Sequence, residues 1–552
     1  MPQQIMVAPK TAGRSALSKR SLFRLFPWAW LAAAYIGTML VMCLCCRGYI
    51  DSDMSSEMVL ADLLNQEGGL LSTNWWYSTE LRVFYLQIFQ RLGLLLFSGD
   101  WFAARMFSQA LWLLVFVLAY LYIGHGLGLR DCGAWGAAAL MCPFGTWYFW
   151  YVSFGGYYLP HALLVMLSCG AMLHLVRPAP PVRRILQVLL LLFSCGASGL
   201  NGLKGLMGFY LPALLAAGVV LVLRLHRAPY KRPYSAIRLL LLSVLSLAVA
   251  GAGYLVNSTV LARSHHFFNF NDRTWSVLDF DALLGKWTDF LSLFGYPTDS
   301  LMQNSIPLLS LNGILGAFGL LIAGAIVVSL FRLLLRWQKL PTLPLFAVLL
   351  FASILIVQGL IFACTGDPGS INASYWLTVV PFVLPVLQLE GETETFRLPA
   401  ARRAAAAACC LCFVCTSIGT VSHFLEEPYR ADPNLKPVCD FLTEKGYTNG
   451  YASFWNGNVM TEWSSGQLEV WVVPDYGAPS ATEWLQRADH AQLPQGEVFL
   501  VSNYGELYSM GLEELPQHAN VVYEDENDFI AMVFPSTDEM VSVIHSINPP
   551  AE

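Results

Sequence analysis

Five carboxylates follow directly after the first long apolar run of the chain. They lie in the stretch RGYIDSDMSSEMVLADLLNQEGG, and they are Asp51, Asp53, Glu57, Asp62 and Glu67. A carboxylate at the edge of an apolar segment can act as a general base, hold a metal ion, line a cation pathway or simply carry surface charge. The sequence around these residues decides among the four roles.

Residues 53–64 mix Met, Leu and Ala with polar residues, a pattern that predicts a short helix lying on the membrane surface. Asp51 or Ser52 would cap this helix, and Asp53 would interact with the helix dipole in its first turn. Glu57 lies one turn later on the same face as Asp53. Asp53 is therefore the candidate base, with Asp51 and Glu57 as supporting residues. The alternative is a capped helix whose other acids are only solvated.

Cationic and further acidic residues lie in the other segments predicted on this side of the membrane. STELR contains Glu80 and Arg82, NGLKGLMGFYLP contains Lys204, and RSHHFFNFNDR contains His265, His266 and Arg273. A lysine in apolar sequence is costly unless its amine reaches water or meets an anion, and lysine suits phosphate as a point charge. Neighbouring histidines on a helix point about 100° apart, which disfavours a shared metal ion. We expect these cations to contact a phosphate, or the histidines a sugar.

The composition requires a membrane protein with several spans. Of the 552 residues 56% are hydrophobic and only 13% are charged, and the mean hydropathy is +0.51. The thirteen cysteines cluster in apolar runs and are expected to pack there, forming neither a disulfide framework nor a metal site. From residue 426 onward, 21 acidic residues face four basic ones, so this segment offers no basic surface for nucleic acid.

Apolar runs near or above the roughly 18 residues needed to cross a bilayer predict the membrane spans. We identify eleven, at 27–46, 101–123, 133–151, 157–176, 185–203, 206–223, 237–256, 311–331, 343–363, 375–389 and 404–424. The expected fold is thus an α-helical polytopic membrane protein, with a transmembrane domain over 27–424.

Basic residues predict the orientation of these spans. Segment 1–26 is rich in Lys and Arg, and alternation of eleven spans puts the basic segments 177–184, 224–238, 332–339 and 397–403 on the same side. The positive-inside rule makes that side cytoplasmic. Segment 425–552 is then extracytoplasmic, and so are two long loops at about 47–100 and 257–310. Further helices on the membrane surface are expected at Leu81–Phe97 and Leu278–Tyr296.

The acidic segment 425–552 is predicted to be a small α/β domain. Strand-like runs occur at 450–454, 468–473, 497–503 and 529–534, and helix-like runs occur at 434–445 and 481–487. It contains neither a phosphate-binding loop nor a nucleophile elbow. We expect an accessory or acceptor-binding unit.

Carboxylates and cations that share one outer cavity suit substitution at C1 of a sugar whose leaving group is a lipid-linked phosphate. The cations would stabilise the charge that develops on the phosphate, and a carboxylate would accept the proton of the attacking hydroxyl. Such a site needs no nucleotide-binding fold.

The chain resembles the GT-C superfamily of glycosyltransferases, in a layout similar to protein O-mannosyltransferases and the aminoarabinose transferases of lipid A. The resemblance covers roughly residues 20–425. SDMSSEM matches the acidic motif after the first span, with Asp53 as the acid and Met54 where a second acid often stands. STELR matches the second loop motif, and LKGLMGFYLP resembles a later KGP-like element without its proline. The resemblance implies a polyprenyl-phosphate-sugar donor, inverting transfer outside the membrane, and Asp53 as the base.

The sequence thus predicts a bacterial plasma-membrane enzyme that moves a hexose or pentose onto a glycan, lipid or protein acceptor of the cell envelope. Asp53 is the expected base, and Glu80 assists it or contacts a substrate hydroxyl. Arg82, Lys204 and His265 or His266, with Arg273, are the expected phosphate contacts. No metal ligands are assigned, and a divalent cation stays an open alternative. A lipid-sugar flippase or a non-catalytic scaffold are the rival functions, but a transporter should carry charges near mid-membrane.

Overall fold

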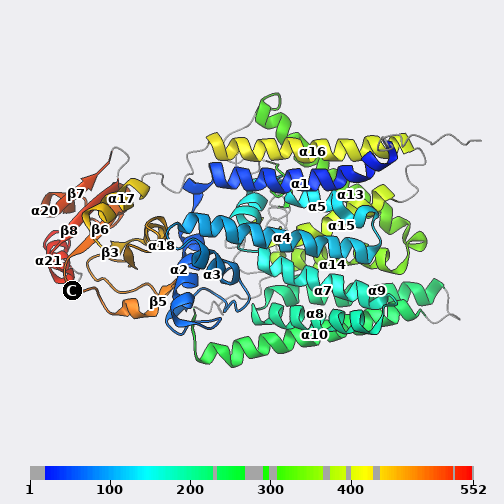
Figure 1. Ribbon diagram of the computed structural model, residues 1–552, viewed down its shortest axis with the longest axis horizontal. Helices are drawn as coiled ribbons and strands as arrows, with labels where there is room; N and C mark the ends of the chain where they lie inside the picture. Colours follow the sequence, from blue (N-terminus) through cyan, green and yellow to red (C-terminus); the bar gives the residue numbers. More distant parts are fainter. Residues whose placement is uncertain are drawn as a thin grey trace, which may run out of the picture.

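A computed structural model describes residues 19–227, 233–267, 290–296, 307–364, 373–392, 399–426, 435–525 and 529–549. Long helices run side by side and form a bundle, and a sheet-containing C-terminal unit lies beyond one end of it (Figure 1). Arg273 and most of the predicted surface helix at 278–296 lie outside the described residues.

The bundle confirms a multi-span membrane protein. Within the described part of the chain, eight helices are long and apolar enough to cross a membrane. They correspond to α1 (Lys19–Cys45), α4 (Trp101–Leu127), α7 (Leu159–Val176), α8 (Pro181–Leu200), α9 (Leu211–Arg227), α10 (Tyr234–Thr259), α13 (Leu311–Leu335) and α14 (Thr342–Ala363). The bundle is completed by α15 (Val380–Glu392) and α16 (Pro399–Glu426).

The run at 133–151 is not the single span that its composition predicts. Helix α5 (Ala134–Met141) ends before Pro143, and Cys142 adopts an extended conformation, as expected for the residue before a proline. A short turn, α6 (Thr146–Tyr148), and a π-helical segment, η3 (Phe149–Phe154), follow. The 375–389 run likewise divides into a 3₁₀ segment, η8 (Ala373–Val379), and the thirteen residues of α15. Proline and non-α turns therefore lower the number of long helices below eleven.

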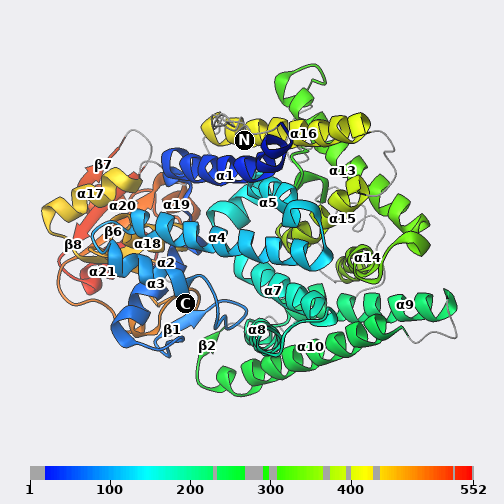
Figure 2. The same cartoon turned by 45° about the vertical axis from the view of Figure 1, so that its right-hand side comes forward.

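The loop at 47–100, which was predicted to be outer, folds into two helices at the end of the bundle that faces the C-terminal unit. These are α2 (Ser52–Glu67) and α3 (Gln87–Leu96), so a helix was correctly predicted at 53–64, whereas the helix expected from Leu81 begins only at Gln87. Helix α2 is more enclosed by protein than a surface helix would be, and its position relative to the membrane stays a prediction. Most of its residues are buried, because it packs against α3 on one side and against α18 (Phe454–Trp463) of the C-terminal unit on the other (Figure 2).

A small mixed sheet joins three distant segments beside α2. Its central strand β1 (Trp75–Tyr77) pairs in parallel with β2 (His266–Phe267), which follows α10. On its other edge β1 pairs antiparallel with β5 (Gln486–Arg487) of the C-terminal unit. The helix predicted at 481–487 is therefore wrong, since its last residues form this strand instead.

The rest of the C-terminal unit is the predicted α/β structure. Its sheet has the order β4 (Glu469–Val472), β3 (Asn449–Ala452), β6 (Val498–Asn503), β8 (Phe529–Phe534) and β7 (Asn520–Glu524). Alternating strand residues enter two apolar clusters, one including residues of α17 (Leu435–Lys445) and the other residues of α21 (Thr537–Ile547). Two short helices, α19 (Tyr504–Ser509) and α20 (Leu515–His518), connect β6 to β7.

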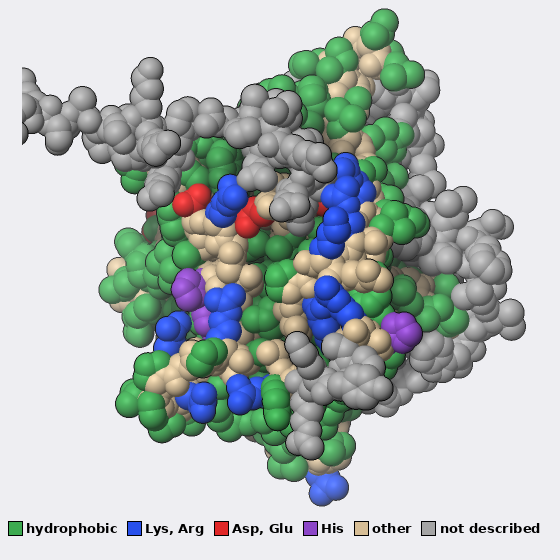
Figure 3. Space-filling model, turned by 90° about the vertical axis from the view of Figure 1, so that its right-hand side faces the viewer, with side chains coloured by type: hydrophobic (Ala, Val, Ile, Leu, Met, Phe, Trp, Pro, Cys, Tyr) green, Lys and Arg blue, Asp and Glu red, His purple; other side chains and the backbone are tan. Residues whose placement is uncertain are grey.

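The opposite end of the bundle is basic. Figure 3 views this end and shows Lys and Arg side chains spread across it. Exposed basic residues lie at the start of α8 (Arg183, Arg184), at the end of α9 (Arg227) and just after α13 (Lys339). The two ends of the molecule thus differ in charge, with the acidic C-terminal unit at the other end.

Candidate active site

Asp51 caps α2, as the sequence predicts. Its Oδ1 accepts a hydrogen bond from the backbone N–H of Met54 at 2.8 Å and one from the hydroxyl of Tyr157 at 2.5 Å. Burial raises the pKa of this carboxyl, although both hydrogen bonds oppose the shift. Asp51 is thus fixed in a structural role at the start of the helix.

One face of α2 carries Asp53, Ser56, Glu57 and Leu60, at helical spacings of three and four residues. Solvent reaches the Asp53 side chain, yet enough protein surrounds it that desolvation raises the pKa to about 6, helped by the nearby Asp51. Within the described residues the Asp53 carboxylate accepts no hydrogen bond. A carboxylate in this state is accessible and more basic than usual, which suits a general base.

A small hollow, with about 270 Å³ of empty space if open solvent is included, lies beside this face of α2. Its other walls come from β1, from the segment that follows β1, and from the C-terminal unit. The lining residues are Ser56, Glu57, Leu60, Trp75, Tyr77, Ser78, Glu80, Arg82 and Leu485. Three of the predicted site residues, Glu57, Glu80 and Arg82, therefore meet in one cavity.

Arg82 lies between Glu57 and an aromatic ring. Its Nη1 is 3.6 Å from Oε1 of Glu57, and its guanidinium lies 4.7 Å from the ring centroid of Tyr85. Desolvation raises the pKa of Glu57 to about 7 despite this cation. The Nε of Arg82 is buried and has no hydrogen-bond partner among the described residues. The pair is loose, and the guanidinium keeps donor capacity.

Glu80 and Lys204 form a second loose pair. The Nζ of Lys204 is 3.7 Å from Oε2 of Glu80 and 5.1 Å from the ring centroid of Tyr158. Oε2 of Glu80 is buried and accepts no hydrogen bond from the described residues. Gly202 makes room for the pair: its φ is +99°, and a Cβ there would lie 2.6 Å from the carboxyl carbon of Glu80. The glycine two residues before Lys204 thus allows loop and carboxylate to approach.

Two buried asparagines hold the backbone that carries Glu80 and Arg82. The Asn201 amide accepts from the N–H of Phe84 at 2.8 Å and donates to its carbonyl at 2.7 Å. The Asn257 amide donates to the carbonyls of Leu81 and Leu200 at 2.8 and 2.6 Å. Sequence reasoning missed both residues. The sequence at Asn257 offers only a glycosylation triplet, Asn257-Ser258-Thr259. The Asn257 side chain is buried and its amide nitrogen makes two hydrogen bonds, so it is not accessible for that modification.

The two predicted histidines do not line the pocket. Nδ1 of His265 lies 3.0 Å from the carbonyl of Leu261, and the ring of His266 lies 4.5 Å from that of Trp76. Both follow α10 at the edge of the mixed sheet, so their contact with phosphate stays a prediction. Among the described residues, no three His, Cys, Asp or Glu side chains are grouped to hold a metal ion.

A tight ion pair joins the bundle to the C-terminal unit near α2. The guanidinium of Arg105 on α4 donates from Nε and Nη2 to the two carboxylate oxygens of Glu462 on α18, both at 2.6 Å. Its Nη2 also donates to the carbonyl of Met54 at 2.8 Å. The Ser52 hydroxyl donates to the carbonyl of Phe454 close by. Polar contacts thus hold both ends of α18 near the first turn of α2.

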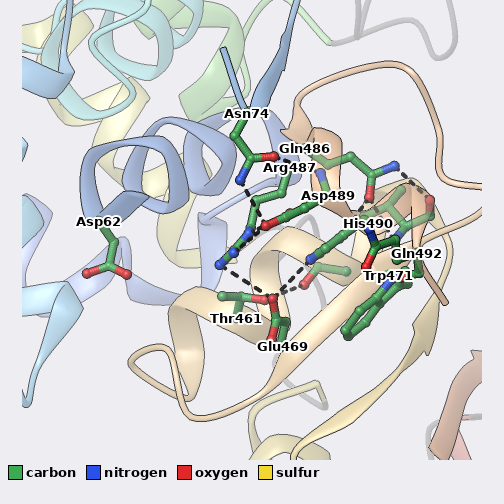
Figure 4. A network of polar contacts seen from close by, with 12 residues as sticks. Asp62, Asn74, Thr461, Glu469, Trp471, Gln486, Arg487, Asp489, His490 and Gln492 are labelled. Atoms are coloured by element: carbon green, nitrogen blue, oxygen red, sulfur yellow. Dashed lines mark hydrogen bonds and ion pairs between the residues drawn. The ribbon is translucent and has the colours of Figure 1, made fainter. Parts of the chain in front are cut away.

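A second polar network holds the C-terminal unit to the segment between α2 and α3. Asn74 exchanges hydrogen bonds with Asp489, through its side-chain nitrogen at 2.8 Å and its side-chain oxygen at 2.7 Å. Asp489 also accepts from Arg487, whose guanidinium lies 3.4 Å from Glu469, and His490 lies 3.2 Å from the same carboxylate (Figure 4). These contacts fix β5 against β1 and hold Leu485 at the pocket.

Comparison with solved structures identifies the architecture. The crystal structure of ArnT from Cupriavidus metallidurans bound to undecaprenyl phosphate aligns over 92% of this chain and 98% of that one, with a TM-score of 0.55 and 12% sequence identity. The apo structure of the same protein aligns over 94% and 99%, with a TM-score of 0.53 and 14% identity. The chain has a GT-C-like fold. The predicted architecture is thus confirmed, although no protein-family model and no curated protein matches the sequence. At this identity the likeness shows the GT-C-like fold and not the activity.

Proposed function

We propose that the chain is a membrane glycosyltransferase that moves a sugar from a polyprenyl-phosphate-linked donor to a cell-envelope acceptor. The observation that carries this proposal is the meeting of Glu57 of α2 with Arg82, and of Glu80 with Lys204, at one end of a GT-C-like bundle. The bound undecaprenyl phosphate of the similar ArnT structure supports a lipid-linked donor here.

The reaction is an inverting substitution at C1 of the donor sugar. The acceptor hydroxyl oxygen forms the new bond to C1, while the bond from C1 to the phosphate oxygen breaks and its electron pair stays on the lipid phosphate. Asp53 takes the proton of the acceptor hydroxyl, because its raised pKa keeps it basic and solvent can reach it. Arg82 and Lys204 stabilise the phosphate charge that develops. Glu80 and Glu57 position these cations and contact substrate hydroxyls.

The proposed orientation follows from charge. The basic end of the bundle (Figure 3) faces the cytoplasm with the N-terminus, and the acidic C-terminal unit and the pocket lie on the outer face. The donor lipid then enters from the outer leaflet, and the acceptor approaches from the side of the C-terminal unit. The acceptor is a glycan, lipid or protein of the envelope.

A deletion strain tests the proposal. Envelope glycans of the strain that lacks the chromosomal copy are compared by mass spectrometry with those of strains carrying the wild type, Asp53→Asn or Asp62→Asn. Asp62 is the matched control, since it lies on the same helix and bonds only to Gln66 among the described side chains. We expect the wild type and Asp62→Asn to restore the missing sugar and Asp53→Asn to fail at equal membrane abundance. Full restoration by Asp53→Asn would rule out this mechanism.

A transfer assay with the purified chain distinguishes a transferase from a flippase. A detergent solution has no membrane between two compartments. A flippase would therefore leave a polyprenyl-phosphate sugar chemically unchanged when the sugar is incubated with envelope extract. Release of sugar-free polyprenyl phosphate by the wild type, and not by Asp53→Asn, supports transfer.

A further inference from the structure

The hollow beside α2 is closed in this structure. It has room for about one water molecule, although Glu57, Glu80 and Arg82 all line it. A sugar or an acceptor chain is many times larger than water and cannot enter. Substrate groups can therefore meet Glu57 inside the hollow only if one of its walls moves.

One wall comes from the C-terminal unit. Leu485, directly before β5, lines the hollow and has 8% of its surface exposed. The next residue, Gln486, bonds through its side chain to the N–H and carbonyl of Val472 in β4, at 3.2 and 2.9 Å. The φ of Leu485 is +50°, in the left-handed region that a leucine adopts only at a cost in free energy. The closed wall thus keeps a leucine in a conformation that it would leave if its surroundings allowed.

The contact of this wall with β1 is short and polar. Strand β5 has two residues, and both pair with β1. Beyond them the N–H of Ala488 donates to the carbonyl of Asn74 at 3.1 Å, and the side chain of Asn74 exchanges exposed hydrogen bonds with Asp489 (Figure 4). The apolar cluster that contains residues of α2 and β1 includes no residue of the C-terminal unit in the described part of the chain. Water can replace exposed hydrogen bonds, so this contact separates at a low cost in free energy.

The contact of the C-terminal unit at α18 is of a different kind. The two bonds between Arg105 and Glu462 are 2.6 Å long, and both side chains are buried. The indole of Trp101 lies against Gly466, where a Cβ would be 2.8 Å from the ring. A buried bidentate pair is much stronger than exposed hydrogen bonds. The contact at α18 is therefore expected to hold while the contact at β5 separates.

We propose that the contact between β1 and β5 is a gate. The edge of the C-terminal unit that carries Leu485 separates from β1 and opens the hollow, while the contact at α18 stays in place. Loss of the pairing with β1 lets Leu485 leave the left-handed region, and this release of strain offsets part of the cost of opening. The gate rests on the proposed transferase function for its purpose, but opening can be measured without turnover.

The first experiment measures opening by thiol labelling of the full chain in nanodiscs. Ser78 lines the hollow with 7% of its surface exposed, so N-ethylmaleimide reaches Ser78→Cys only when the gate opens. Ser52→Cys reports on the contact at α18, because Ser52 is buried and its hydroxyl bonds to the carbonyl of Phe454. Peptide mass spectrometry separates both positions from the thirteen native cysteines. We expect labelling at position 78 and none at position 52. No labelling at 78, or equal labelling at both, overturns the proposal.

The second experiment weakens the gate in the Ser78→Cys background. Asp489→Ala removes the hydrogen bond that the Asn74 amide donates across the contact, so labelling at position 78 should be roughly three to ten times faster. Asp440→Ala is the matched control, because Asp440 is an acid of the same unit that pairs with Lys436 on its own helix. Thermal unfolding shows that each variant is folded. If Asp489→Ala labels no faster than Asp440→Ala, this contact does not keep the hollow closed.

The third experiment locks the gate with a disulfide. Asn74→Cys and Ala488→Cys place thiols opposite each other on antiparallel segments, where Cβ atoms lie roughly 4.5–5.5 Å apart, close to what a disulfide requires. Oxidation should lower labelling at position 78 in the Ser78→Cys background, and transfer in the Ser78 background, each by at least about tenfold. Dithiothreitol should restore both. Each single cysteine variant, oxidised in the same way, is the control for the native cysteines.

The two readouts separate the gate from the transferase function. A disulfide that leaves labelling unchanged, or that stops labelling and leaves transfer at the wild-type rate, overturns the gate and keeps the transferase. Cysteines that do not pair on oxidation also overturn it, because β1 and β5 then do not lie together as the gate requires. Conversely, a wild type that labels as expected but transfers no sugar rejects the transferase function alone.

Discussion

Two kinds of ion pair lie near α2, and they differ in how completely their groups are satisfied. Arg105 and Glu462 meet through two hydrogen bonds of 2.6 Å, with 3% and 1% of their side chains exposed. The pairs of Glu57 with Arg82 and of Glu80 with Lys204 are 3.6 and 3.7 Å long and up to 25% exposed. The first pair has its charge-assisted bonds in place, and the others do not.

This difference distinguishes an ion pair that holds helices together from ion pairs that can still contact a ligand. A buried bidentate pair has no spare capacity, so Arg105 and Glu462 hold α18 against α2 and α4. The loose pairs keep buried polar atoms without partners among the described residues, which costs free energy unless a ligand satisfies them. The same helix thus takes part in a saturated contact, through the Met54 carbonyl, and in an unsaturated pocket, through Glu57.

The largest expected effect comes from breaking the tight pair. Glu462→Ala leaves the Arg105 guanidinium buried without its counterion, which should destabilise the protein by about 3–5 kcal/mol. Thermal unfolding in detergent measures the loss. Transfer should also fall, because Arg105 bonds to the Met54 carbonyl within α2.

The double variant Arg105→Met with Glu462→Leu is the control for charge burial. An apolar pair of similar volume removes the unpaired charge, so stability should recover toward that of the wild type. If Glu462→Ala unfolds at the same temperature as the wild type, the pair is not a structural joint and the comparison with the pocket pairs fails.

In contrast, breaking a loose pair should lower the rate of transfer far more than the stability of the protein. Arg82→Gln removes the cation proposed for the phosphate and should lower kcat/KM by roughly 10²-fold, as removal of one transition-state donor does in other enzymes. Stability should change little, because the pKa of Glu57, already about 7, rises further without the cation and the buried carboxyl becomes neutral. Kinetics and thermal unfolding of the same preparation separate the two effects. A large loss of stability in Arg82→Gln with normal transfer would assign Arg82 a structural role.

The sequence predicted the local features of this site and missed its long-range ones. The cap at Asp51 and the face shared by Asp53 and Glu57 depend on residues within one turn, so spacing alone was sufficient. The pairing of β5 with β1 joins residues about 410 positions apart, and no local pattern encodes it. Leu485 therefore could not be recognised as a pocket residue.

The ion pair of Arg105 had a signal that sequence reasoning did not use. Arg105 stands alone among apolar residues near the start of a predicted span, where an isolated cation implies a partner. The identity of that partner, Glu462, depends on how the C-terminal unit docks. The break after Met141 was also readable, because Pro143 and Gly145 interrupt the run that was predicted to span.

A smaller effect, on pH dependence, sharpens the assignment of the base. Asp53 has its pKa raised to about 6, first by desolvation and then by the charge of Asp51, and it must be ionised to accept a proton. Transfer should therefore be constant above about pH 7 and fall as pH decreases through 6, reaching about one tenth at pH 5. The profile of kcat/KM against pH measures this limb.

Asp51→Asn tests whether that limb belongs to Asp53. Asparagine is as good a helix cap as aspartate, so its side-chain oxygen can still accept from the Met54 N–H and α2 should keep its start. The substitution removes the negative charge that raises the pKa of Asp53, so the acidic limb should move to lower pH while the plateau stays. A limb that does not move would mean that another group titrates, and Glu57, with its pKa near 7 and its loose pair with Arg82, would then be the residue to examine as the base.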